Sequence, residues 1–175
     1  KERSETLLKK IINSNLKFTT DPKIKEGVEN LYFESNNMKS KKGMYTSVDK
    51  SWYFFPWNKD EIGIFNFIQP IFNNVILLNG KKPVDIFKNT PIDNCIQRFH
   101  LINYPLNFGQ ISLHRDPVNV CQVNSGIYLT EYGVDYKEGG FYVLNDENRE
   151  FNVDELVHIG DMVLFYPGIA HGVHP

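Results

Sequence analysis

The sequence has few cysteines, no long apolar run and little net charge. Two cysteines, Cys95 and Cys121, occur in 175 residues, too few for a disulfide framework, so we expect inert thiols and a reducing, cytoplasmic location. No apolar stretch approaches the roughly 20 residues of a membrane span, and the polar first residues lack the apolar stretch of a signal peptide. The formal charge of −2 gives no reason to expect nucleic acid or a membrane as partner.

The sequence also contains no glycine-rich phosphate loop and no internal repeat. Its hydrophobic content of 41% and charged content of 23% are those of an ordinary globular protein. A chain of this length suits one domain, residues 1–175, with a sizeable core. Because 14% of the residues are aromatic, we expect that core to be rich in aromatic rings.

The first part of the chain, residues 1–93, is expected to consist of helices and loops. Leu7, Leu8, Ile11 and Ile12 recur at helical spacing, which predicts an N-terminal helix with one apolar face. Residues 18–50 are polar and have no periodicity, which predicts a long loop.

An aromatic segment and a second helix are expected next. Residues 52–57 (WYFFPW) contain five aromatic side chains in six positions, which favours a core plug that covers one sheet over the wall of a substrate pocket. Pro70 suits the first position of a helix, an apolar face follows, and Gly80 is a typical helix end. The pattern therefore predicts a helix over residues 70–80.

From about residue 94 the pattern changes to short strands. The segments 95–104, 109–114, 125–131, 140–144 and 161–166 are rich in β-branched or aromatic residues and are separated by proline, glycine and asparagine. Helices followed by closely spaced strands predict an α+β protein. We expect residues 94–175 to form a double-stranded β-helix (a jelly-roll or cupin-like core) with the N-terminal helices packed on one sheet.

The residues that point most directly to chemistry are His114, Asp116 and His171. In a strand, side chains alternate between faces, so His114 and Asp116 point the same way and Arg115 the other. Two histidines and one carboxylate can occupy one face of a metal ion and leave three adjacent positions open, as in non-haem Fe(II) oxygenases. An isolated His-x-Asp is a weak signal, so its context decides.

Five short patterns follow one another in a characteristic order. They are Tyr104-Pro105, His114-Arg115-Asp116, Ile127-Tyr128-Leu129, Gly139-Gly140-Phe141-Tyr142, and Gly160–Phe165 followed by His171-Gly172-Val173. In this order the strand-rich half of the chain resembles the 2-oxoglutarate/Fe(II)-dependent oxygenases, and particularly their prolyl-hydroxylase-like branch.

The resemblance implies that His114, Asp116 and His171 are catalytic and hold Fe(II). It implies an enzyme that uses O2 and the cosubstrate 2-oxoglutarate to hydroxylate an unactivated C–H bond, releasing succinate and CO2. The substrate would be a small molecule, an amino acid or a peptidyl side chain. Because halogenating relatives have a small residue in place of Asp116, the carboxylate favours hydroxylation, or a related desaturation or cyclisation.

The resemblance also implies cosubstrate-binding residues. Tyr104 and Tyr128 would face the 2-oxoglutarate, and Tyr142 would lie where the family has a residue of the cosubstrate wall. The family's basic anchor for the distal carboxylate falls beyond Pro175, so we expect the chain to be cut short there. Its continuation is then expected to present an arginine or lysine.

Several alternatives remain open at this stage. His174 competes with His171 for the third ligand position, and the pattern favours His171. Tyr104 and Tyr128 are also compatible with plain core aromatics. Other readings of the whole chain are a cupin-like metal-binding barrel that is not an oxygenase, such as an isomerase or a sensor, and a structural barrel without metal.

Overall fold

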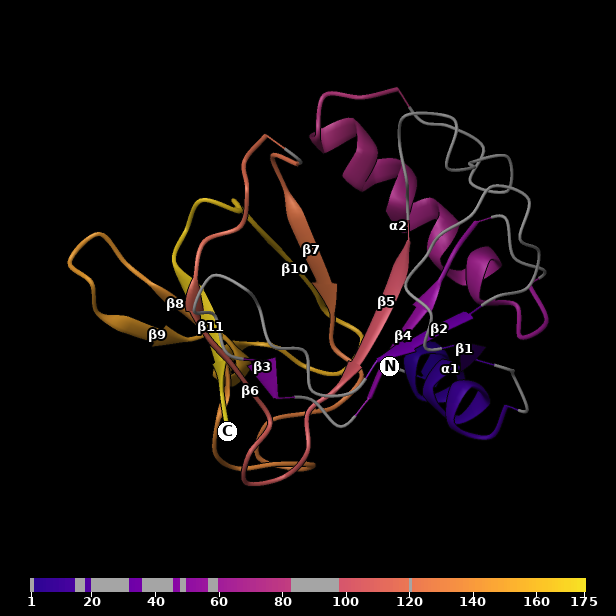
Figure 1. Cartoon of the computed structure of the whole chain (residues 1–175), viewed down its shortest axis with the longest axis horizontal. Helices are drawn as coiled ribbons and strands as arrows, with labels where there is room; N and C mark the ends of the chain where they lie inside the picture. Colours follow the sequence, from indigo (N-terminus) through magenta and orange to yellow (C-terminus); the bar gives the residue numbers. More distant parts are fainter. Residues whose placement is uncertain are drawn as a thin grey trace.

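The computed structural model describes residues 2–14, 18–19, 32–35, 46–47, 50–56, 60–82, 98–119 and 121–175. Its elements (Figure 1) are α1 (Glu2–Ile12), β1 (Phe18–Thr19), β2 (Tyr32–Ser35), β3 (Thr46–Ser47), β4 (Lys50–Phe54), α2 (Ile64–Leu78), β5 (Phe99–Asn103), β6 (Gln110–His114), β7 (Asn124–Ile127), β8 (Gly140–Leu144), β9 (Glu150–Asn152), the 3-10 turn η3 (Asp154–Leu156), β10 (Met162–Phe165) and β11 (His171–His174). The predicted α+β class is confirmed, with mainly antiparallel sheets.

Both helices pack on one face of a sheet with the strand order β1-β2-β4-β5. The core between the helices and this sheet is apolar and buried. Its members are Leu7 and Ile11 of α1, Phe54 of β4, Ile64, Phe65 and Ile68 of α2, and Leu101 of β5. The aromatic segment contributes Phe54 to this core, which confirms its expected place in the core. Neither helix is long and apolar enough to cross a membrane.

Helix α2 begins six residues earlier than predicted, at Ile64 rather than at Pro70. The carboxylate of Asp60 accepts hydrogen bonds from the backbone N–H groups of Ile64 (2.7 Å) and Phe65 (2.9 Å), which satisfies donors at the helix start. An interior proline costs about 3 kcal/mol. Burying Ile64, Phe65 and Ile68, at about 1.5–3 kcal/mol each, offsets that cost.

The prediction of a loop over residues 18–50 was wrong where the structure describes that segment. It contains β1, β2 and β3. β1 pairs with β2 and β2 with β4, whereas β3 pairs with β6, which lies far along the chain. The predicted strands after residue 98 are confirmed with shifted ends, and β9 was missed. Cys95 and Trp57 lie outside the described residues.

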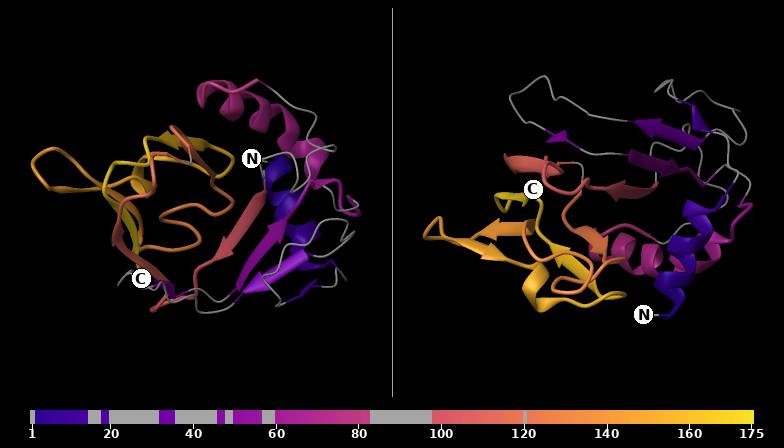
Figure 2. Two further views of the ribbon diagram at one scale, coloured as in Figure 1. Left: turned by 45° about the horizontal axis from the view of Figure 1, so that its top comes forward. Right: turned by 90° about the horizontal axis from the view of Figure 1, so that it is seen from below.

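The strands after β5, joined by β3 from the N-terminal part, form a five-stranded sheet, β3-β6-β11-β8-β9, and a two-stranded sheet, β10-β7. Phe141 of β8 and Phe165 of β10 lie between them with ring centroids 5.2 Å apart. Figure 2 shows the two sheets facing each other, beside the sheet that carries the helices. This layered arrangement is compatible with a β-sandwich.

On the β4-β5 sheet, His100 points away from the helices. It pairs across the strands with Tyr53, and the two rings stack with centroids 4.1 Å apart. Burial, and to a smaller degree the charge of Arg98, lowers the pKa of His100 to about 3. Its Nε2 atom is buried and makes no hydrogen bond to any residue that the structure describes.

We predict that His100→Phe makes the protein less sensitive to acid. The unfolded chain binds a proton at His100 below its ordinary pKa of 6.5, whereas the folded chain stays neutral down to about 3, so folding stability falls as the pH drops between these values. Phenylalanine retains the stack on Tyr53 and does not titrate. Urea unfolding at pH 7, 5.5 and 4.5 measures the difference, and an equal loss of stability in both proteins would contradict the prediction.

Candidate metal centre

The structure brings His114, Asp116 and His171 together at the ends of two paired strands. One ligand atom from each residue lies within 4.8 Å of the others. The Nε2 atom of His114 is 3.6 Å from Oδ1 of Asp116, and Nε2 of His171 is 3.4 Å from Oδ2. Ligands about 2.1 Å from one metal ion and at right angles lie about 3 Å apart, so the spacing fits a shared ion.

The register between β6 and β11 creates this cluster. His114 and His171 lie directly opposite each other in the antiparallel pair. Between this pair and the next, Ile111 with Val173, β6 uses one residue more than β11. Such a bulge re-aims side chains and is common beside active sites.

The segment before β11 is fastened to the His-x-Asp segment. The backbone N–H of Asp116 donates to the carbonyl of Pro167 at 2.9 Å. The guanidinium of Arg115 donates to the carbonyl of Gly168. The side chain of Arg115 therefore connects the segment that carries Asp116 to the segment that precedes His171.

Both imidazoles are oriented by backbone carbonyls. Nδ1 of His114 lies 2.8 Å from the carbonyl oxygen of Ser112, and Nδ1 of His171 lies 2.8 Å from that of Ile169. Because a carbonyl only accepts, each Nδ1 carries the proton, and each Nε2 is left with a lone pair for a metal.

The charge state of His171 suits a ligand. Burial lowers its pKa, the neighbouring His114 lowers it further, and the hydrogen bond to Ile169 and the charge of Asp116 oppose this only in part. The ring is therefore neutral at neutral pH, as metal binding requires.

Two phenylalanines that the sequence analysis missed flank the cluster. Phe141 and Phe165 have ring centroids 5.9 Å and 4.9 Å from that of His171. They form an apolar wall on one side of His171. The Gly139-Gly140-Phe141-Tyr142 pattern already contains Phe141. The sequence analysis, however, expected the wall residue to be Tyr142, one position later.

The structure does not bring Tyr142 to this site. Tyr142 lies opposite Gly172, whereas His171 lies opposite Val143, and neighbouring side chains of a strand point to opposite faces. Tyr142 instead stacks on His174 with ring centroids 4.0 Å apart. His174 also lies away from the cluster and pairs through Nε2 with Glu150 at 2.9 Å.

The hydroxyl of Tyr128 is held by a buried carboxylate, Asp154, whose residue is 4% exposed. Tyr128 donates to Oδ1 of Asp154 at 2.6 Å, and Tyr136 donates to Oδ2 at 2.7 Å. The backbone N–H of Phe141 also donates to Oδ2, at 3.0 Å. Burial, followed by the charge of Asp154, raises the pKa of Tyr104, so Tyr104 lies near the same carboxylate.

Sequence reasoning missed Asp154 and Tyr136, and the signal that could have found Asp154 is Gly140. This glycine has a φ of 99° and lies so close to Asp154 that a Cβ atom at position 140 would collide with the carboxylate. The Gly139-Gly140 pair is thus explained by an approaching side chain as well as by backbone conformation.

Asn124 is a further residue that the sequence analysis missed. Its side chain lies against Asp116 and next to Cys121. Cys121 is half-buried, and burial raises the pKa of its thiol, with the charge of Asp116 adding to the effect. This accords with the expected unreactive thiol.

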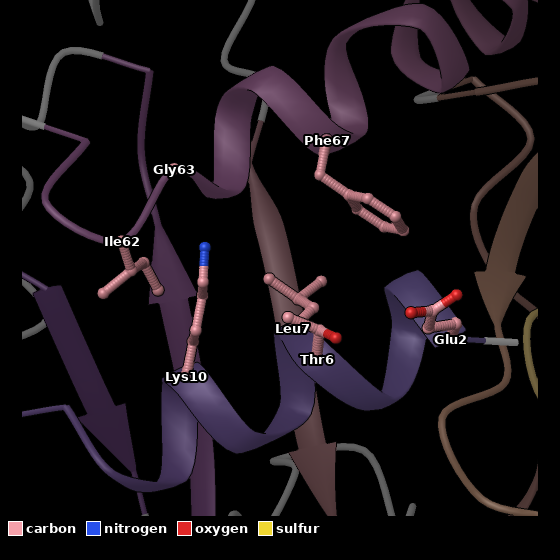
Figure 3. Close-up of a pocket in the computed structure, with 7 residues that line it drawn as sticks. All are labelled: Glu2, Thr6, Leu7, Lys10, Ile62, Gly63 and Phe67. Atoms are coloured by element: carbon pink, nitrogen blue, oxygen red, sulfur yellow. The ribbon is translucent and has the colours of Figure 1, made fainter.

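A separate pocket of about 350 Å³ lies between α1 and the start of α2 (Figure 3). It is lined by Glu2, Thr6, Leu7, Lys10, Ile62, Gly63 and Phe67. None of these residues belongs to the metal cluster, so the pocket is a different feature of the molecule.

Replacing Asp154 by leucine is expected to destabilise the fold by about 3 kcal/mol or more. Two tyrosine hydroxyls and one backbone N–H would lose a charged acceptor, and each such hydrogen bond contributes about 1.5–3 kcal/mol. Asp146→Leu, at an exposed turn position, is the matched control and should leave stability nearly unchanged. Urea unfolding of both variants provides the measurement; equal stabilities would show that Asp154 does not hold this region together.

Comparison with protein-family models, with curated proteins and with solved structures found no match to this chain.

Proposed function

We propose that the protein is an Fe(II)- and 2-oxoglutarate-dependent dioxygenase that hydroxylates an unactivated C–H bond of a small molecule, an amino acid or a peptidyl side chain. The observation that carries the proposal is the cluster of two carbonyl-oriented histidines and one carboxylate. This donor set is typical of non-haem Fe(II) oxygenases. The ordered motifs around it support the same family and a double-stranded β-helix as the finer description of the fold.

His114, Asp116 and His171 would hold the iron. Two neutral imidazoles and one carboxylate leave Fe(II) with a net charge of +1, which favours chelation of a dianionic 2-oxo acid. When bound, the iron activates O2 and couples the decarboxylation of 2-oxoglutarate to succinate and CO2 with insertion of one oxygen atom into the substrate. The chain contributes oriented ligands and, through Phe141 and Phe165, an apolar wall.

Tyr104 is the better candidate of the two tyrosines for the cosubstrate contact. Tyr128 has one hydroxyl hydrogen and donates it to Asp154, so it reaches a cosubstrate carboxylate as a donor only by giving up that bond. Hydrogen bonds to a carboxylate contribute about 1.5–3 kcal/mol. Exchanging one carboxylate for another at Tyr128 therefore adds little to cosubstrate affinity.

A metal-binding barrel that is not an oxygenase, an isomerase or a sensor, is the second candidate. The observation that favours it is Asp154, a buried carboxylate among the tyrosines that would receive 2-oxoglutarate. A like charge at this place disfavours a dianion. The two candidates differ in whether the metal site responds to 2-oxoglutarate.

Alanine at any one of the three ligand positions is expected to abolish activity. Loss of one of three ligands removes both the affinity and the geometry of the site. The matched control is His174→Ala, which should retain most of the activity, because His174 pairs with Glu150 instead.

The measurement is an anaerobic titration with Fe(II), with and without 2-oxoglutarate, followed by 2-oxoglutarate turnover in air. A weak visible charge-transfer band that needs both additions supports the oxygenase. Iron binding without that band favours the second candidate. If the His174→Ala variant is inactive and the His171→Ala variant is active, the third ligand is assigned incorrectly.

Tyr104→Phe is expected to raise the KM for 2-oxoglutarate by roughly tenfold or more, since the variant loses one hydrogen bond to a carboxylate. Tyr128→Phe should raise it less, because its hydroxyl is held by Asp154. Steady-state kinetics at saturating substrate give both values. If neither substitution changes the KM, both tyrosines are core residues and the cosubstrate lies elsewhere.

A further inference from the structure

Asn124, the first residue of β7, contacts the carboxylate of the metal cluster directly. Its Nδ2 atom donates a hydrogen bond of 2.6 Å to Oδ2 of Asp116. A hydrogen bond to a charged acceptor is about twice as strong as a neutral one. One lone pair of Oδ2 is thus engaged by Asn124, whereas Oδ1 accepts no hydrogen bond from the residues that the structure describes, so Oδ1 is the oxygen more readily available to a metal.

The amide of Asn124 is held in the orientation that this contact requires. Its Oδ1 atom accepts a hydrogen bond of 2.9 Å from the thiol of Cys121. Because the oxygen side of the amide faces a donor, the NH2 side faces Asp116.

The segment that leads to Asn124 is anchored to the end of α2 by Asn79. Oδ1 of Asn79 accepts from the backbone N–H groups of Gln122 (2.6 Å) and Val123 (3.0 Å). Its Nδ2 donates to the carbonyls of Val123 (3.1 Å) and Val75 (2.8 Å). One side chain therefore joins the last turn of α2 to the residues just before β7.

We propose that Asn124 is a positioning residue that keeps Asp116 a one-oxygen ligand, and that Asn79 holds Asn124 in place from the end of α2. This inference rests on the proposed metal site. A carboxylate with both oxygens free binds a metal through either one or two. Two-oxygen binding would occupy one of the three positions that a cosubstrate and O2 need, so fixing Oδ2 preserves the open face.

The substitution that tests the contact is Asn124→Leu, which retains the size of the side chain and removes its donor. Asn124→Ala, which also removes the donor and adds no bulk, serves if the leucine variant does not fold. Asn145→Leu is the control of the same residue type, because the side chain of Asn145 likewise makes hydrogen bonds, to the backbone N–H groups of Glu147 and Arg149, but at the turn between β8 and β9. Circular dichroism verifies folding in each variant.

Co(II) is the probe, since it reports affinity by calorimetry and coordination by its visible absorption, without any turnover. We expect Asn124→Leu to bind Co(II) roughly 10–100-fold more weakly than the unmodified protein, the usual effect of losing an outer hydrogen bond to a ligand. Its visible bands should also change, because Asp116 would then bind through both oxygens. Asn145→Leu should change neither quantity.

Asn79→Leu and the Asn79→Leu/Asn124→Leu double variant test the anchor. If Asn79 acts through Asn124, Asn79→Leu weakens Co(II) binding and the double variant is no weaker than Asn124→Leu alone. Additive losses would overturn the role of Asn79.

The outcomes separate this inference from the proposed function. If His114→Ala binds Co(II) as tightly as the unmodified protein, the metal site itself is wrong. If His114→Ala loses binding while the Asn124 variants retain the affinity and spectrum of the unmodified protein, the metal site stands and the role of Asn124 is overturned. If Asn145→Leu loses as much Co(II) affinity as Asn124→Leu, the loss reflects protein stability, and the role of Asn124 is again overturned.

Discussion

The candidate site depends on one interaction, the antiparallel pairing of β6 with β11. This pairing places His114 opposite His171. A shift of one residue would turn either histidine to the other face of the sheet, since the side-chain period of a strand is two. The bonds from Asp116 and Arg115 to Pro167 and Gly168 fix the strand ends in this register.

Two carboxylates, Asp116 and Asp154, accept hydrogen bonds among the C-terminal strands, and their surroundings differ. Asp116 is half-buried, faces two imidazoles and receives one amide donor. Asp154 is buried, and two tyrosines and a backbone N–H saturate it. Since a carboxylate whose oxygens are fully hydrogen-bonded is a poor metal ligand, the contrast supports Asp116 as the chemical group and Asp154 as the structural one.

The helical part contributes to the site indirectly. Helix α2 is held against the β4-β5 sheet by the buried residues Ile64, Phe65 and Ile68. Its far end carries Asn79, which bonds the segment before β7. Through Asn79 the helix is thus connected to the segment that carries Asn124, the residue that donates to Asp116.

The sequence by itself determined the α+β class, both helices, most C-terminal strands and the candidate ligands His114, Asp116 and His171, because periodicity and motif spacing are local properties of a chain. Tertiary structure alone decided the early start of α2, the pairing of β2 with β4 and the pairing of β3 with β6. It also decided that Phe141 rather than Tyr142 lies beside His171, and which groups Asn124 and Asp154 contact. The strand pairings and side-chain contacts depend on which distant residue lies opposite, and the start of α2 depends on burial against the sheet. No local pattern encodes either of these.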